Sequence, residues 1–369
     1  MSARGIIIGG GIVGLSIALG LAATGMEVLV LDGNDADSRA SYGNAGLIWV
    51  QSKGVDHLPY ARWSRRSASL WPEFSRELED TTGIDVEYQQ RGGLSLCIDA
   101  AEMAARRAMV DRVAAQLGSD NDVEMVDAAY VRERIPQAGP RVLGASWCPS
   151  DGHVNPLLLM GALRKRNAAL GVRILTGKKA TRVGMDGSHL TVYGDGFSLR
   201  ADRVVIAAGL ATQNLAATAG MTVPVMPIRG QIVVTERLKP LIGYPTPTTR
   251  QARSGSIIFG NSHETDVESP QTTLPVLASH AQRAVTEFPF LASTRILRCW
   301  GAIRVMPKDG MPVYASSKTC PGAYAVACHS GITLTAIHAK IISASIAAGE
   351  LPAAVNTFSD ERFHVVPTA

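Results

Sequence analysis

The chain opens on Gly-Ile-Ile-Ile-Gly-Gly-Gly-Ile-Val-Gly at residues 5–14, a short apolar run that meets three consecutive glycines. The run Ile6–Ile8 is β-branched, which is typical of a buried strand, and Ile12–Thr24 has the small and apolar residues of a packed helix. Gly25 ends this helix, and Glu27–Leu31 predicts a second strand. Strand, helix and strand in this order predict one βαβ unit with parallel strands.

The glycines between the first strand and the helix have the spacing GxGxxG, at Gly9, Gly11 and Gly14. In a dinucleotide-binding turn the first glycine allows the tight turn, the second lets the backbone approach a pyrophosphate, and the third lets the helix pack closely on the strand. Asp32, eighteen residues after the last glycine, is placed to accept a hydrogen bond from a ribose hydroxyl. We therefore predict a dinucleotide site, and this turn alone leaves NAD and FAD open.

A second segment, Arg39–Gly46, is rich in small residues and begins within ten residues of Asp32. A loop of this composition can return to the same sheet edge and supply backbone groups along a long cofactor. A second backbone cradle favours FAD. The cofactor-binding residues expected from the two segments are Gly9, Gly11, Ile12, Val13, Gly14, Asp32, Ser41, Asn44, Ala45, Gly46 and Leu47.

Composition and charge narrow the class of protein. The 369 residues are 46% hydrophobic, which is enough for one large domain or two packed ones and excludes a disordered tail protein. The formal charge of +4 is spread without a run of five like charges, so we expect no nucleic-acid partner and no polybasic membrane anchor. The apolar stretch Gly5–Leu31 predicts no membrane span, because three glycines interrupt it and it divides into two strands around a helix.

The five cysteines, Cys97, Cys148, Cys299, Cys320 and Cys328, are odd in number and form no CxxC pair. This pattern suits neither a disulfide framework nor a complete zinc or iron–sulfur site, so we expect no metal in this chain. A reducing cytoplasm is the location that it favours.

The remaining patterns predict an α/β fold in which a Rossmann-like FAD-binding domain is interleaved with a mixed-sheet α+β substrate domain. We assign residues 1–85, 150–215 and 320–369 to the first domain, and 86–149 and 216–319 to the second. Strands are predicted at Val172–Leu175, Val204–Gly209, Gln231–Thr235, Ser256–Gly260 and Tyr324–Ala327, and helices within Tyr60–Gly83, Met103–Leu117 and Leu157–Leu170, and from Cys328–Leu334 to about Ala348.

Taken together, these motifs resemble the FAD-dependent D-amino-acid oxidase and glycine oxidase superfamily over nearly the full length of the chain. The resemblance rests, in the family's order, on Gly9–Gly14 with Asp32, Val204–Gly209, Pro227–Gln231, Arg304–Pro312 and His329–Leu334. Within the superfamily, the chain is most similar to the B subunits of bacterial opine oxidases. Related hydrogen cyanide synthase and D-hydroxyproline dehydrogenase subunits belong to the same group. This similarity rests on Asn44–Ile48, Val50–Gly54 and Cys328–Leu334.

The resemblance implies a glycine oxidase-like fold, noncovalent FAD along the βαβ unit, and oxidation of a secondary amine that carries a carboxylate to an imine. Subunits of this type work with a larger A subunit and a small iron–sulfur protein, and FMN or an iron–sulfur cluster would lie at or in those partners. Cys328 stands where the simple oxidases usually carry glycine, so we expect electrons to pass to a partner instead of oxygen. The further FAD contacts that the resemblance implies are Val183, Ala208, Gly209, Ser330, Gly331, Ile332 and Thr333.

Arg304 matches the superfamily's substrate arginine, whose planar fork can pair with a carboxylate. The alternative for an arginine is a surface ion pair. Opines join an amino acid to a keto acid through a secondary amine, so they carry at least two carboxylates and need a second cation. The candidates for that cation are Arg250, Arg253 and Lys53. His263 and Glu264 could face substrate or form a turn, and His329 could lie near the flavin or satisfy a backbone carbonyl in its turn.

Three functions remain open from the sequence. The first is an FAD dehydrogenase subunit for opines or related N-substituted or cyclic amino acids. The second is a self-sufficient oxidase of glycine, sarcosine or D-amino acids, which would consume oxygen as an isolated chain. The third is a flavin-binding structural subunit, which would keep full complex activity after Arg304→Ala.

Overall fold

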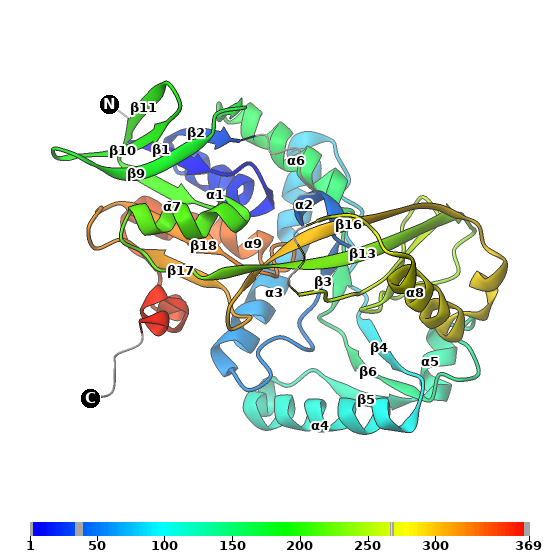
Figure 1. Ribbon diagram of the computed structural model, residues 1–369. Helices are drawn as coiled ribbons and strands as arrows, with labels where there is room; N and C mark the ends of the chain where they lie inside the picture. The colour runs from blue at the N-terminus through cyan, green and yellow to red at the C-terminus, as the bar shows by residue number, and fades with distance from the viewer. Residues whose placement is uncertain (1–2, 34–39, 266, 268, 365–369) are drawn as a thin grey trace.

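The computed structural model describes residues 3–33, 40–265, 267 and 269–364, and a six-stranded sheet lies at its centre (Figure 1). The strand order is β17-β18-β12-β1-β2-β8, with β17 antiparallel to β18 and the other neighbours parallel. These strands are β1 (Arg4–Ile8), β2 (Glu27–Asp32), β8 (Arg173–Thr176), β12 (Arg203–Ile206), β17 (Val313–Ser316) and β18 (Ala323–Ala327). The predicted βαβ unit is present, and the strand at Val204 lies beside it as expected.

Both faces of this sheet are covered, which explains why its strands are continuous apolar runs. Ile7 clusters with Ile17 of α1 and Ile342 near the carboxyl terminus, whereas Ile6 clusters on the other face with Val192 of β10. The first layer and its flank contain α1 (Ile12–Ala23), α3 (Leu58–Thr82), α6 (Pro156–Ala169), α9 (Thr335–Ile337), a π-helical turn (His338–Ile342) and α10 (Ser343–Ala348). The second layer contains β9 (Ala180–Asp186), β10 (His189–Gly194), β11 (Phe197–Ala201) and α7 (Thr212–Thr218).

Antiparallel sheets form the second region. Strands β13 and β16 pair from Val225 opposite Pro307 to Thr235 opposite Ile296, and they cross the centre of Figure 1 toward α8. The sheet orders are β14-β15-β13-β16 and β4-β6-β5. The bounds here are β4 (Gly93–Cys97), α4 (Ala100–Leu117), β5 (Glu124–Asp127), α5 (Ala128–Arg134), β6 (Gly144–Cys148), β13 (Val225–Arg237), β14 (Thr249–Gln251), β15 (Ser256–Phe259), α8 (Leu274–Glu287) and β16 (Ile296–Pro307).

Short elements complete the described part of the chain. The helix α2 (Ala40–Gly43) precedes β3 (Leu47–Ile48), which pairs with β7 (Gly152–His153). The 3₁₀ turns are Gly118–Asp120, Gly209–Ala211, Pro289–Ser293, Ala353–Phe358 and Asp360–Phe363. In residues 3–33, 40–265, 267 and 269–364 no single helix is long and apolar enough to cross a membrane, and only the pair Thr335–Ala348 and Ala353–Phe363, bent by 103°, passes that test together.

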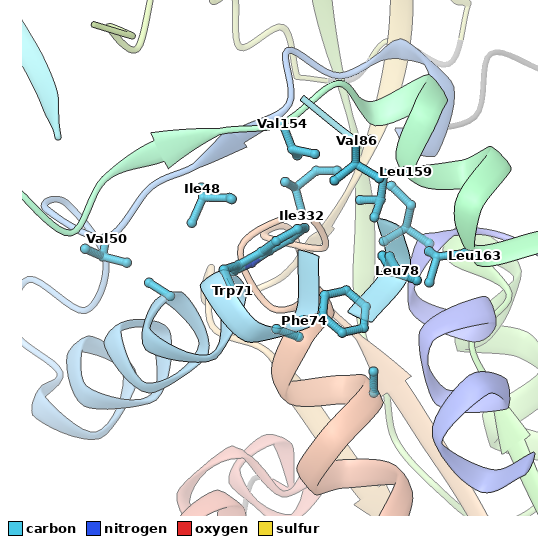
Figure 2. Packing of buried hydrophobic residues seen from close by; sticks show 14 of the residues in the cluster. Ile48, Val50, Trp71, Phe74, Leu78, Val86, Val154, Leu159, Leu163 and Ile332 are labelled. Carbon is cyan, nitrogen blue, oxygen red and sulfur yellow. The ribbon is translucent and has the colours of Figure 1, made fainter. Parts of the chain in front are cut away.

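An apolar cluster joins the segment after α2 to the turn after β18. Trp71 of α3 is fully buried, and Ile332, Ile48 and Val50 belong to the same cluster (Figure 2). The Trp71 indole also stacks on the Tyr88 ring, with centroids 5.7 Å apart. This core fixes residues 47–50 and 330–333 next to each other, although they lie at opposite ends of the chain.

The predicted α/β class with a mixed-sheet second region is confirmed, with three local differences. The predicted final helix begins only at Thr335 and contains the π turn, because residues 330–334 form hydrogen-bonded turns instead. Strand β16, which the sequence analysis does not give, runs past Arg304 to Pro307, since β13 pairs with it along its whole length. Strand β17 lies within the segment 216–319 and yet pairs in the six-stranded sheet; the domain division otherwise stays a prediction.

Candidate functional site

The turn between β1 and α1, and the first turn of α1, leave no room for a side chain at Gly9 and Gly14. Gly9 has a φ of +117°, and a Cβ there would lie 2.2 Å from the carbonyl oxygen of Ala207. A Cβ on Gly14 would lie 2.0 Å from the carbonyl oxygen of Gly9. The strand end, the turn and the first turn of α1 are therefore in backbone contact, which is the close approach that a dinucleotide turn requires.

The amino end of α1 faces both predicted cofactor loops. Gly11 is its N-cap and supplies no side-chain cap, while the Ile12 N–H donates to Ser41 Oγ over 3.0 Å. A Cβ on Gly331 would lie 3.5 Å from Val13, so the turn after β18 reaches the same end of the helix. Helix N–H groups without intrahelical partners and the positive end of the helix dipole favour a pyrophosphate at this point.

Asp32 ends β2 with only 3% of its surface exposed. A Cβ on the neighbouring Gly10 would lie 2.4 Å from Asp32 Oδ2, and Nη2 of Arg164 in α6 lies 3.7 Å from that same oxygen. The carboxylate is thus held at the carboxyl end of the second strand, where a ribose is bound in this type of fold. No sequence pattern indicated Arg164, because α6 reaches this point only by packing on α1.

The segment after α2 is a fixed loop. The Asn44 amide donates to the backbone carbonyls of Ala40 and Ser41 in α2, and its Oδ1 accepts from the Gly46 N–H over 2.8 Å. Gly46 has a φ of +76°, and a Cβ there would lie 2.1 Å from the carbonyl oxygen of Val154. The Ala45 carbonyl accepts from Nε of Arg250. Every group that shapes this loop is local or buried, so it can present its backbone to a flat ring system.

The turn after β18 has free backbone donors. The Thr333 carbonyl accepts from Ser67 Oγ over 2.6 Å and from Trp71 Nε1 over 3.1 Å, which pins the turn to α3. In the described part of the chain nothing accepts a hydrogen bond from the N–H groups of Gly331, Ile332 and Thr333. A group of fixed N–H donors is suited to an electron-rich carbonyl edge on which negative charge gathers.

Arg304 lies in β16, opposite Ile228 of β13, with its side chain half-buried. Its Nη1 donates to the Ser262 carbonyl over 2.7 Å, and Nη2 lies 3.5 Å from Asn261 Oδ1. Among the residues described, no carboxylate forms an ion pair with it. Burial lowers the pKa of Arg304 from its ordinary value, but arginine keeps its charge at any physiological pH. Arg304 is therefore a fixed cation without a carboxylate partner among the described residues, unlike the surface ion pair of the alternative interpretation.

A second layer of polar groups fixes the carbonyl that holds Arg304. Glu264 accepts from Arg229 Nη2 over 2.5 Å, from Gln231 Nε2 over 2.9 Å and from Ser262 Oγ over 3.2 Å. The hydrogen bond from Arg229 holds the pKa of Glu264 below its ordinary value. Glu264 therefore positions Arg304 through the backbone of Ser262, a role that the sequence did not reveal.

We expect Glu264→Ala to lower the free energy of unfolding by about 3 kcal/mol, because it leaves the buried Arg229 guanidinium unpaired. Since the pKa of Glu264 is lowered in the folded protein, the stability it supplies is present above pH 4.5 and is lost as the pH falls below that value. Chemical denaturation at neutral and acidic pH measures both effects. Glu361→Ala, which removes the fully exposed pair with Lys318, is the matched control and should leave the unfolding midpoint nearly unchanged; equal midpoints for the two variants would contradict the assignment.

The charge of Arg304 acts on three further candidates, Lys53, His263 and His329. Lys53 Nζ is 3.4 Å from His329 Nδ1, and the rings of His329 and His263 have centroids 6.5 Å apart. Burial first, and the charge of Arg304 second, lower the pKa of Lys53 to about 8. Burial and the neighbouring cations also lower the pKa of both histidines, so both imidazoles are neutral at neutral pH. The site thus contains two cations and two neutral rings.

The other candidate cations have different partners. Arg253 is exposed and forms an ion pair with Asp85. Arg250 is 3% exposed and supports the loop at Ala45, and burial lowers its pKa to about 10. Neither of them interacts with Arg304 or Lys53 in the described part of the chain.

The remaining predicted cofactor contacts are placed as follows. Ala208 and Gly209 follow β12, and Ala208 lies against the Gly9 turn. The Val183 N–H in β9 donates to Thr218 Oγ1 over 2.9 Å, so this backbone donor already has a partner. Arg39, the first residue of the predicted second loop, lies outside the described residues.

Comparison with known proteins agrees with this geometry. The sequence pattern of the family described as FAD dependent oxidoreductase matches residues 5–345. The chain belongs to this family. The opine oxidase B subunit of Rhizobium meliloti is 39% identical over 358 residues, covering 97% of this chain and 96% of that protein, and its namesake from Agrobacterium tumefaciens (strain Ach5) is 39% identical over 359 residues, covering 97% of each.

The fold of this FAD dependent oxidoreductase is that of a glycine oxidase. The crystal structure of glycine oxidase from Geobacillus kaustophilus superposes with a TM-score of 0.89 at 22% identity, covering 99% of this chain and 100% of that one. The predicted family and the glycine oxidase-like fold are confirmed. The enzyme class, an FAD-dependent oxidoreductase, is confirmed as well.

The residues of this family member fit FAD. Gly9 and Gly14 form a turn that any side chain would fill, and the N–H groups of Gly331 and Ile332, which have no acceptor among the described residues, can bind a ring carbonyl. The residues that would hold the cofactor are therefore Gly9–Gly14 and Asp32 for the diphosphate and ribose, and Asn44–Leu47 and Ser330–Thr333 for the flavin, as the sequence predicted. That assignment stays a prediction, and substitutions at the glycine turn test it.

Proposed function

We propose that this chain is the catalytic subunit of a heteromeric dehydrogenase that oxidises the C–N bond of a secondary-amine amino acid of the opine class. The observation that carries the proposal is Arg304, a fixed guanidinium with no carboxylate partner among the described residues. It lies in a chain that is 39% identical to an opine oxidase B subunit. A half-buried cation that lacks a carboxylate partner among the described residues is best explained by a carboxylate that the substrate brings.

The protein's own part in this reaction is mostly orientation. Arg304 binds the substrate carboxylate with its fork, and Glu264 keeps that fork in place through Ser262. The rings of His263 and His329 are neutral, so they add no further positive charge beside the amine, which must be unprotonated to react. When bound, FAD supplies the two-electron oxidant that takes the hydrogen of the α-carbon with its electron pair.

The balance of the reaction is that one C–H and one N–H bond break and a C=N bond forms. Two electrons and two protons leave the substrate. Water then splits the imine into an amine and a carbonyl compound. For an opine the products are an amino acid and a keto acid.

The partners remain part of the proposal. We propose a larger A subunit and a small iron–sulfur protein as the electron acceptors, with FMN or an iron–sulfur cluster at or in them, and a cytoplasmic location. The name of the relatives, which designates a subunit, supports a multi-subunit enzyme. Noncovalent FAD is supported by Cys328, because burial raises the pKa of its thiol to about 12 and leaves it uncharged.

Anaerobic titration of the purified flavin-loaded chain tests the proposal. Octopine or nopaline should bleach the visible flavin band, with slow recovery when air is admitted, and glycine and sarcosine should do so poorly. Rapid recovery in air after bleaching by glycine or sarcosine would replace the proposal with a self-sufficient oxidase. No bleaching by any of these amines or by D-hydroxyproline, with flavin present, would contradict catalysis by this subunit.

A further inference from the structure

Arg304 and Lys53 carry two positive charges in one site, whereas a single substrate carboxylate would need one. Arg304 and Lys53 are both half-buried, and neither forms an ion pair with a carboxylate in the described part of the chain. Each acts on the same two rings, because Arg304 and Lys53 both lower the pKa of His263 and of His329. Two like charges held in one partly desolvated space are costly unless a ligand neutralises both.

The contacts form a continuous arc from one cation to the other. Lys53 Nζ meets His329 Nδ1 at 3.4 Å, and the His329 ring lies 6.5 Å from the His263 ring, centroid to centroid. The residue before His263 is Ser262, whose carbonyl accepts from Arg304 Nη1 over 2.7 Å. The two cations are thus at the ends of the arc, with two neutral rings between them.

We infer that Lys53 and Arg304 together bind a substrate that carries two carboxylates joined through a secondary amine. Arg304 holds the carboxylate next to the reacting carbon, Lys53 holds the second carboxylate, and the imidazole rings lie along the amine. Because His329 uses only one of the three Lys53 N–H donors, two remain for the ligand. The inference rests on the proposed function for the reaction itself, and it adds the residue that selects dicarboxylates over monocarboxylates.

The structure gives the three candidates for the second carboxylate-binding cation different partners. Arg253 is occupied by Asp85, and the guanidinium of Arg250 supports the carbonyl of Ala45. Among the described residues, the Lys53 side chain forms one hydrogen bond, to His329. Arg250 Nη1 is buried without a hydrogen-bond partner among the described residues, but Arg250 and Arg253 do not act on His263 or His329 as Arg304 does. Lys53 acts on both rings, so of the three it is the cation placed to share a ligand with Arg304.

The charge on Lys53 makes the preference depend on pH. Burial and Arg304 lower its pKa to about 8, while Cys328 and Asp151 act in the opposite direction. Below that value Lys53 is an ammonium and binds the second carboxylate, and above it the attraction fades. The Cys328 thiol has its pKa raised to about 12 and stays neutral across this range.

Two matched pairs of ligands test this with the FAD-loaded chain. Iminodiacetate and sarcosine are secondary amines with two carboxylates and one, and flavin bleaching measures their oxidation. Thiodiglycolate and methylthioacetate are their unreactive thioether counterparts, and the change in the flavin spectrum or calorimetry measures their binding. The variants are Lys53→Met, Lys53→Arg and, as control, Arg253→Met.

The wild type should bind thiodiglycolate more tightly than methylthioacetate, and Lys53→Met should reduce that ratio by roughly 10- to 150-fold, the effect of one charge-assisted hydrogen bond. Lys53→Arg should restore most of the ratio, Arg253→Met should leave it unchanged, and the wild-type ratio should fall above pH 8. An equal loss for both thioethers, or a shift of the flavin reduction potential without a change in the ratio, would overturn the inference and assign Lys53 to the flavin. Failure of iminodiacetate and the opines to bleach the flavin, with a Lys53-dependent ratio retained, would instead overturn the proposed reaction alone.

Discussion

Replacing Arg304 with methionine should lower kcat/KM for the substrate amino acid by about 30- to 4,000-fold, mostly through KM. The range corresponds to about 2–5 kcal/mol for removing one partner of a desolvated, hydrogen-bonded charge pair. The physical reason is that Ser262 and Asn261 fix the guanidinium before substrate arrives. Binding the carboxylate therefore costs little side-chain entropy, and more of the interaction energy contributes to affinity. Anaerobic flavin reduction over a range of substrate concentrations measures the effect.

The same variant should fold normally. Removing a half-buried cation that has no carboxylate partner in the described part of the chain takes away a desolvation cost, so the thermal midpoint should stay constant or rise. Arg298→Met, at an exposed position on the same strand, is the matched control and should leave kcat/KM unchanged. Normal kinetics in Arg304→Met would contradict the substrate role and favour a structural subunit. Arg304→Lys should recover part of the loss, because the charge remains but the planar fork does not.

The first thirty-two residues were predictable because their information is local. Apolar runs of the right length, glycines at fixed spacing and a terminal Asp32 determine a βαβ unit without reference to the rest of the chain. The order of motifs along the chain extended this to a mixed-sheet second region, which the structure contains. The π turn at His338–Ile342 has no such local signal, because it reflects how that helix packs on α1.

The substrate site could be predicted only in part, for a geometric reason. Lys53, His263, Arg304 and His329 come from four separate segments, which meet only in the folded chain. Three cations therefore looked equivalent in the sequence. Their partners separate them, since Asp85 binds Arg253 and the loop carbonyl of Ala45 binds Arg250.

Gly9→Ala should yield a protein that is purified largely without FAD. The new Cβ would lie 2.2 Å from the Ala207 carbonyl oxygen, and alanine does not readily adopt a φ of +117°. Crowding of this kind costs about 1–3 kcal/mol and the unfavourable φ about 1 kcal/mol more. If the turn opens to relieve this, the affinity for FAD should fall by roughly 30- to 700-fold. Flavin absorbance per chain after gel filtration, and titration of the apoprotein with FAD, measure the loss.

Two further variants distinguish damage to the FAD-binding turn from a general loss of folding. Gly25→Ala places alanine at a φ of +87° with no atom within 4 Å, so it reports the backbone cost alone and should retain FAD. Gly11 has an ordinary φ of −80°, and a Cβ there would meet only Ser41 Oγ, at 2.9 Å, so Gly11→Ala should fold with a normal thermal midpoint. Its methyl group would nevertheless occupy the face on which the pyrophosphate is expected, and FAD should bind less tightly. Full flavin content in both Gly9→Ala and Gly11→Ala would place the cofactor elsewhere, because a backbone cradle cannot tolerate a side chain at either position.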